Sequence, residues 1–236
     1  MKKHIPNAIT CLNLLCGCLA IYFVFKDNAV WAAYLVGIAA VFDFLDGMVA
    51  RLLHAYSEIG KQLDSLADMV SFGVVPGAIM FSLMARSQGV QASEVELSEM
   101  LFPFAAFLIT VFSALRLAKF NIDTRQTTSF IGLPTPACTI FVSSLVLILA
   151  NDGFNLSGYI LNQWVLLGLT VVLSYLLVAE LPLFALKFKS LNWRDNSIRF
   201  IFLFLAVVFV AVLNFAAVPL IIVTYILLSL LKPSQS

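Results

Sequence analysis

Long apolar stretches follow one another from the first residues of the chain to the last, with only short polar connections between them. The hydrocarbon core of a bilayer is about 30 Å thick, so a helix needs about 20 residues to cross it. A crossing segment must also pair its backbone polar groups internally, which a helix does by itself. The sequence therefore predicts an all-α, polytopic bundle of transmembrane helices.

Composition supports this fold class and excludes others. Of the 236 residues, 61% are hydrophobic and only 11% are charged, whereas a soluble domain has about 25% charged residues. A water-soluble enzyme, a disordered protein and a nucleic-acid-binding protein are therefore excluded. The net charge of +1 provides no global attraction for a polyanion. We expect one integral membrane domain over residues 1–236, without a sizeable domain outside the membrane.

The apolar pattern predicts eight spans. Six form a core over about residues 1–190, and two short ones form a hairpin over about 199–232 that turns at Asn214 to Pro219. Six spans plus a re-entrant or tilted pair is the alternative. Pro182 lies inside the sixth predicted span and should kink it. The predicted spans are 7–25, 29–53, 62–85, 100–120, 134–150, 161–186, 199–214 and 217–232.

The basic residues predict an orientation for these spans. With a cytoplasmic N-terminus, only Lys26 and Arg86 fall on the outer side. Cytoplasmic loops carry the excess of Lys and Arg in membrane proteins, so both termini should be cytoplasmic. The residues on the inner side are Lys2, Lys3, Arg51, Lys61, Arg116, Lys119, Arg125, Lys187, Lys189, Arg194, Arg199 and Lys232.

Four carboxylates lie where a membrane protein should have none. Asp43 and Asp46 end the second predicted span, and Asp64 and Asp68 begin the third. A charge inside the bilayer costs about 2.5–3.5 kcal/mol on insertion scales and usually marks function. Each pair shares a helix face, because its members are three or four residues apart. The short connection makes the two helices antiparallel neighbours, so the pairs can face each other.

Divalent cations would remove the repulsion between these four acids. Hard oxygen ligands without His or Cys favour Mg²⁺ or Mn²⁺ over zinc, and four carboxylates can hold two such ions. Gly47, Ala50 and Gly60 leave room for a ligand against the helix backbone, and Arg51 offers its guanidinium to phosphate oxygens. This pattern predicts a site for a nucleoside diphosphate group. A cation or proton transporter is the rival, although transporter sites lie near the midplane and these acids lie near one edge.

The same residues carry a resemblance to a known family. Residues 43–68 contain D-F-L-D-G-M-V-A-R, eight residues, and G-K-Q-L-D-S-L-A-D. This resembles the CDP-alcohol phosphatidyltransferase motif D-x-x-D-G-x-x-A-R-x8-G-x3-D-x3-D. The resemblance implies a membrane enzyme, often a homodimer, that transfers a substituted phosphate from a CDP-alcohol to a second alcohol and releases CMP.

The resemblance also implies roles for individual residues. Asp43, Asp46 and Asp64 would bind metal, and Asp68 would bind metal and act as the general base. The nucleotide and its phosphates would contact Gly47, Ala50, Arg51 and Gly60.

Four further segments resemble the bacterial phosphatidylserine synthase branch of the family. They imply CDP-diacylglycerol and L-serine as substrates, and a bacterial cytoplasmic membrane with the active site facing the cytoplasm. Glycerol 3-phosphate or another alcohol is the alternative acceptor. The segments are residues 5–14 (I-P-N-A-I-T-C-L-N-L), 68–77 (D-M-V-S-F-G-V-V-P-G), 116–121 (R-L-A-K-F-N) and 130–136 (F-I-G-L-P-T-P).

Four polar residues outside the motif have two interpretations each, and a fifth has no assigned role. Asn7 and Thr10 could bind the phosphates of CDP-diacylglycerol or cap a helix. Arg116 and Lys119 could bind the serine carboxylate or anchor the helix at the inner boundary. Glu180 has no assigned role, and pairing with Lys187 or satisfying a kinked helix would explain it as well as catalysis would.

Overall fold

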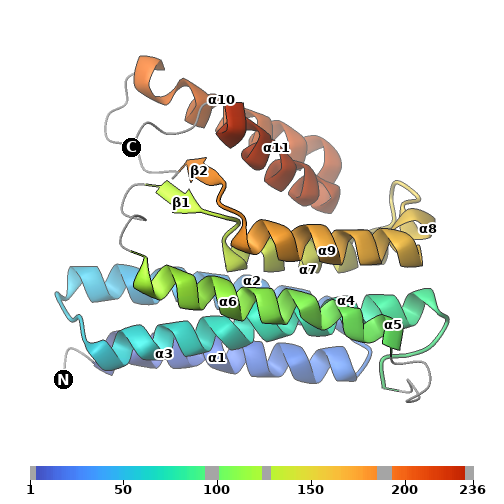
Figure 1. The fold of residues 1–236 in the computed structure, drawn as a ribbon, viewed down its shortest axis with the longest axis horizontal. Helices are drawn as coiled ribbons and strands as arrows, with labels where there is room; N and C mark the ends of the chain where they lie inside the picture. Colours follow the sequence, from blue (N-terminus) through green and yellow to red (C-terminus); the bar gives the residue numbers. More distant parts are fainter. Residues whose placement is uncertain (1–3, 94–100, 124–128, 185–192, 232–236) are drawn as a thin grey trace.

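The computed structural model describes residues 4–93, 101–123, 129–184 and 193–231, which are mostly helical (Figure 1). Several basic residues on which the predicted orientation depends lie outside these ranges, so the orientation stays a prediction. They are Lys2, Lys3, Arg125, Lys187, Lys189 and Lys232.

The first two helices form a hairpin. Helix α1 (His4–Phe25) and helix α2 (Ala29–Leu52) pack along their length. Asn28 caps α2 by accepting a hydrogen bond from the backbone of Trp31, at 3.5 Å. The small buried residue Ala32 lies on the inner face of α2, where a short side chain lets the helix backbones approach closely.

The third helix is long and buried, and its winding changes in the middle. It comprises α3 (Glu58–Asp68), a π-helical segment η1 (Met69–Val74) and α4 (Val75–Ser87), which continue one another without a break. Ser57 caps its N-terminus by accepting from the amide of Gly60 at 3.0 Å. In the apolar 18-residue stretch of this helix, 72% of the residues are buried inside the protein, so the helix forms the centre of the bundle.

The π-helical segment is held by side chains of two neighbouring helices and by its own Ser71, which bonds to a third. Thr110 donates a hydrogen bond to the carbonyl of Gly73 at 3.0 Å, and Thr139 donates to the carbonyl of Phe72 at 2.9 Å. Ser71 donates to the carbonyl of Asn13 on α1 at 3.0 Å. Irregular backbone at membrane depth needs such partners, and they fix the position of the helix just after Asp68.

The second half of the chain covers this centre. Helix α6 (Leu108–Ile122) follows two short turns, α5 (Leu101–Phe104) and η2 (Ala105–Phe107). The elements after it are β1 (Ser129–Ile131), α7 (Thr135–Asn151), α8 (Ser157–Ile160), α9 (Gln163–Val178), β2 (Pro182–Phe184), α10 (Trp193–Leu213), η3 (Asn214–Ala216) and α11 (Ala217–Leu231).

Five helical stretches in the described residues are long and apolar enough to cross a membrane: His4–Phe25, Ala29–Leu52, Glu58–Ser87, Leu101–Ile122 and Asn196–Leu231. The last stretch contains the turn η3, so α10 and α11 lie side by side as the predicted hairpin (Figure 1). Two further apolar helices, α7 and α9, are shorter. The structure therefore has the helical, apolar architecture of a membrane protein, and eight full spans stay a prediction.

The predicted kink at Pro182 is wrong, because helix α9 ends four residues earlier, at Val178. Pro182 lies in β2, which pairs with β1 as a two-stranded antiparallel sheet in an otherwise helical protein. Gly132, with φ of +75°, packs against the last carbonyls of α9, where a Cβ atom would lie 2.8 Å from the carbonyl oxygen of Leu177. The amide of Leu133 donates to the carbonyl of Leu176 at 2.8 Å, which closes the helix end.

Candidate active site

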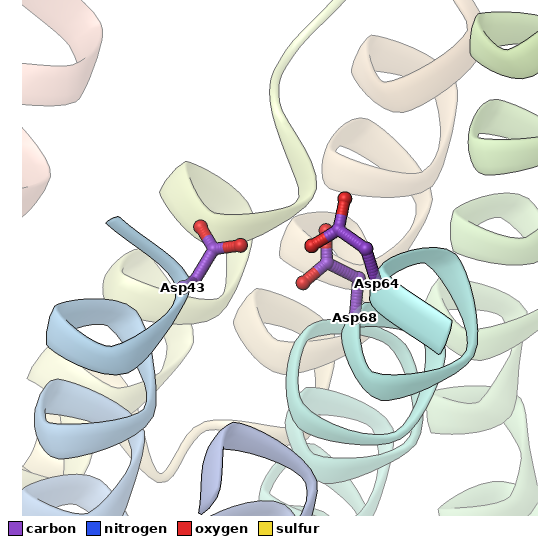
Figure 2. Close-up of side chains that lie close together, drawn as sticks. All are labelled: Asp43, Asp64 and Asp68. Atoms are coloured by element: carbon purple, nitrogen blue, oxygen red, sulfur yellow. The ribbon is translucent and has the colours of Figure 1, made fainter. Parts of the chain in front are cut away.

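Three carboxylates from two helices converge at the centre of the site. Asp43 projects from α2 toward Asp64 and Asp68 on α3 (Figure 2), and carboxylate oxygens of all three lie within 4.8 Å of one another. Each of the three side chains is half-buried. The cluster exists because the i, i+4 spacing of Asp64 and Asp68 places both on the face of α3 that is turned toward α2.

The donor set fits a divalent cation. Within the described residues these carboxylates form no ion pair with Lys or Arg, so their charges repel one another in a partly desolvated site. Clustered carboxylate oxygens without nitrogen or sulfur ligands match the preference of Mg²⁺ and Mn²⁺. The residues present therefore suit the metals that the sequence predicts.

Asp46 lies beside this cluster rather than in the same group of three. Its side chain is buried, and the Thr10 hydroxyl donates to its Oδ2 at 2.7 Å. The Pro6 carbonyl is 3.1 Å from the same hydroxyl. Thr10 thus contacts a predicted metal ligand directly, whereas the sequence suggested a phosphate contact or a helix cap.

Asn13 is a site residue to which sequence analysis gave no role. It is fully buried in α1, and its Nδ2 donates to Asp68 Oδ1 at 3.3 Å. Its Oδ1 is buried without a hydrogen-bond partner in the described residues. The available signal was an asparagine in the middle of an apolar helix, where an amide needs a polar partner.

A cavity of about 230 Å³ adjoins the acids and brings the predicted nucleotide contacts together. Helix α1, the end of α2 and the start of α3 form its wall. All six residues predicted to contact CDP-diacylglycerol line it, together with two of the predicted metal ligands. The lining includes Asn7, Thr10, Asp46, Gly47, Ala50, Arg51, Gly60 and Asp64, and also Pro6, Ala55, Tyr56, Ser57 and Lys61.

Small residues keep this cavity open. At Gly60 a Cβ atom would lie 3.0 Å from both Asn7 Oδ1 and Ser57 Oγ, so a larger residue would press on two polar groups of the wall. Arg51 and Lys61 are exposed at its mouth. The cavity therefore combines a narrow backbone-lined floor, two cations and neighbouring carboxylates, which suits a phosphate-bearing ligand with bound metal.

A second, smaller cavity of about 40 Å³ lies between the C-terminal part of α6 and the end of α9, where Arg116 and Lys119 contribute to its lining. Arg116 is only 7% exposed, and its Nε has no hydrogen-bond partner in the described residues. Its guanidinium lies 5.7 Å from the ring centroid of Phe120 and interacts electrostatically with Asp68. The structure therefore separates Arg116 and Lys119 from the first cavity but couples Arg116 to the acidic cluster.

Comparison with known proteins agrees with this geometry. Residues 3–176 match the family described as CDP-alcohol phosphatidyltransferase. The chain is similar to proteins named CDP-diacylglycerol–serine O-phosphatidyltransferase. One is from Helicobacter pylori strain J99, 34% identical over 209 residues, which cover 87% of this chain and 81% of the relative. Another is from Bacillus subtilis, 33% identical over 184 residues, which cover 76% and 89%.

Two further proteins are similar to this chain. A Mycobacterium leprae protein with the same name is 30% identical over 231 residues, which cover 95% of this chain and 69% of the relative. An archaetidylserine synthase of Methanothermobacter thermautotrophicus is 31% identical over 148 residues, which cover 61% of this chain and 58% of the relative. The converging aspartates, the cavity beside them and these matches lead to one conclusion: the chain belongs to the CDP-alcohol phosphatidyltransferase family.

Proposed function

We propose that this protein transfers the phosphatidyl group of CDP-diacylglycerol to the hydroxyl of L-serine, giving phosphatidylserine and CMP. The observation that carries the proposal is the convergence of Asp43, Asp64 and Asp68 at the edge of the cavity lined by Gly47 and Arg51. The names of the relatives support serine as the acceptor. Family membership favours this reaction over a transporter.

The aspartates prepare the site for the pyrophosphate. Asp43, Asp46, Asp64 and Asp68 would hold two divalent cations, Mg²⁺ or Mn²⁺, which when bound would stabilise charge on the pyrophosphate and on departing CMP. Thr10 fixes one oxygen of Asp46 through its hydrogen bond. Orientation of ligating carboxylates by such partners is a general requirement of metal sites.

The first cavity would hold the nucleotide. Gly47, Ala50 and Gly60 let the cytidine approach the backbone, and Arg51 pairs with phosphate oxygens. Asn7 reaches the same cavity next to Gly60 and would donate a hydrogen bond to the phosphates.

Asp68 would act as the general base. It accepts the proton of the serine hydroxyl while the serine oxygen forms a bond to the phosphorus in line with the departing group. The bond from phosphorus to the CMP oxygen breaks, and CMP leaves with the electron pair. Asn13 donates a hydrogen bond to Asp68 Oδ1, which would hold the carboxylate in one orientation for this step. Arg116 and Lys119 would bind the serine carboxylate.

We also infer the setting of this reaction. The protein is integral to the bacterial cytoplasmic membrane, with the site facing the cytoplasm, where serine and CDP-diacylglycerol headgroups are both accessible. It acts as a homodimer. These inferences rest on the charge distribution and on the family resemblance.

An acceptor assay tests the proposal. Purified protein in detergent, given CDP-diacylglycerol and Mn²⁺ or Mg²⁺, should release CMP with L-serine and much less with glycerol 3-phosphate or inositol. Excess EDTA should abolish release, and added Mn²⁺ or Mg²⁺ should restore it. Release with glycerol 3-phosphate but not serine would refute the acceptor, and activity that is insensitive to EDTA would refute the metal site.

A further inference from the structure

Glu180 lines the small second cavity together with Arg116 and Lys119. The side chain is exposed, and within the described residues it forms no hydrogen bond or ion pair. We propose that Glu180 binds the ammonium group of the amino-acid acceptor and makes the enzyme select a zwitterion over an anionic alcohol. The proposal rests on the proposed function, because it assigns one more contact to the same acceptor.

The end of helix α9 brings Glu180 to this place. The helix stops at Val178, and β1 with Gly132 is packed against its last carbonyls. Glu180 therefore lies in the connection between α9 and β2. There it lines the same cavity as the C-terminal part of α6. In the kinked span over 161–186 that the sequence predicted, Glu180 would have lain within the membrane helix instead.

Arg116 shows that the cavity is built for a ligand. This arginine is only 7% exposed, and its Nε is buried without a hydrogen-bond partner in the described part of the chain. A buried guanidinium group with an unused donor is costly unless an acceptor completes it. The carboxylate of an amino acid would supply that acceptor.

The charges around the cavity complement an amino acid. Two cationic side chains, Arg116 and Lys119, and two anionic ones, Asp123 and Glu180, line a space of about 40 Å³. One ordered water needs about 10–15 Å³ by this measure, so the space accepts about three water-sized atoms, the size of a carboxylate group. The ammonium group would then lie at its open edge, beside the exposed Glu180. Glycerol 3-phosphate has no cation for Glu180 and would bring a second anion toward it, so Glu180 would disfavour that competitor.

If Glu180 binds the ammonium group, its charge should matter only for an acceptor that carries this group. For L-serine, Glu180→Gln should lower kcat/KM by about tenfold, mainly through a higher KM, because a charge-assisted contact is lost. For 3-hydroxypropanoate, which is serine without its ammonium group, the same change should leave kcat/KM unaltered or raise it. Glu180→Asp should retain part of the preference for serine.

Two controls separate specificity from folding. The KM for CDP-diacylglycerol should be the same in Glu180→Gln as in the unmodified enzyme. Glu58→Gln, the same change at an exposed position that does not line the cavity, should leave both acceptors unaffected.

Other outcomes would overturn the proposal. An equal loss for both acceptors would indicate a structural role for Glu180, and no loss with serine would refute its role while the serine reaction stands. An unmodified enzyme that releases CMP with another alcohol but not with L-serine would overturn both the acceptor and the role of Glu180.

Discussion

The third helix and the C-terminal hairpin are both long and apolar, but they use their residues in different ways. In the apolar 18-residue stretch of Glu58–Ser87, 72% of the residues are buried inside the protein. In the corresponding stretch of Asn196–Leu231, only 11% are buried. The third helix is tied to α1, α6 and α7 by side-chain hydrogen bonds to its π-helical segment. The hairpin lies beyond α7 and α9 (Figure 1), and its described residues mostly present exposed Val, Leu and Phe.

This difference teaches that hydropathy alone does not tell what a membrane helix packs against. A helix that faces lipid needs only apolar character, because acyl chains accept any such side chain. A helix that faces other helices needs fitted small residues and polar partners. Asp64 and Asp68, two of the proposed metal ligands, lie on the second kind of helix, where groups that react can be held in place.

The largest effect should come from the acid that we assign as the base. Asp68→Asn keeps the size of the side chain but cannot accept the serine proton, so turnover should fall by about a thousandfold. Binding of CDP-diacylglycerol, measured by equilibrium titration, should persist. Full turnover in this variant would refute the base assignment.

The same substitution should lower the free energy of unfolding more in the third helix than in the C-terminal hairpin. Leu83 on α4 is fully buried, whereas Leu227 on α11 is 56% exposed. Leu83→Ala should lower the free energy of unfolding by about 2–4 kcal/mol, because it leaves a cavity, and Leu227→Ala should lower it by less than about 1 kcal/mol. Thermal unfolding in detergent measures both, and equal losses would break the comparison.

A smaller effect is expected at Asn13, a positioning residue. Asn13→Ala removes the hydrogen bond to Asp68 Oδ1, so kcat should fall by about tenfold while the KM for CDP-diacylglycerol changes little. Asn13→Asp should be worse, since it replaces the donor by another anion. A rise in KM without a change in kcat would indicate that Asn13 contacts the nucleotide instead.

Much of the site could be predicted because it is local in the sequence. Asp43 and Asp46 lie one helical turn apart, as do Asp64 and Asp68, and the connection between the pairs is short, so spacing alone limits how they can meet. The structure brings Asp43, Asp64 and Asp68 together, as this spacing suggests. The hairpin turn near Asn214 was also predictable from its break in the apolar pattern.

The remainder depends on contacts between distant residues. After Val178 the sequence continues mainly apolar through Leu183 and Phe184, and the breaks in it, Glu180 and Pro182, lie beyond the observed helix end. The end is set by Gly132 and Leu133, more than 40 positions earlier in the chain. The π-helical segment also depends on distant residues, because Thr110 and Thr139 on other helices donate hydrogen bonds to its carbonyls. Single-segment patterns do not contain this information.

The π-helical segment lets the two ends of one continuous helix present different faces to their neighbours. Each residue of an α-helix turns the chain by about 100°, so the wider turns at Met69–Val74 reset the angular phase between the residues before and after them. The part before the segment can aim Asp64 and Asp68 at α2, while the part after it seats α4 against α6 and α7. If Met69–Val74 wound as a regular α-helix with the same number of residues, α4 would be rotated relative to α3, and the acids and the buried face of α4 could no longer both face their partners.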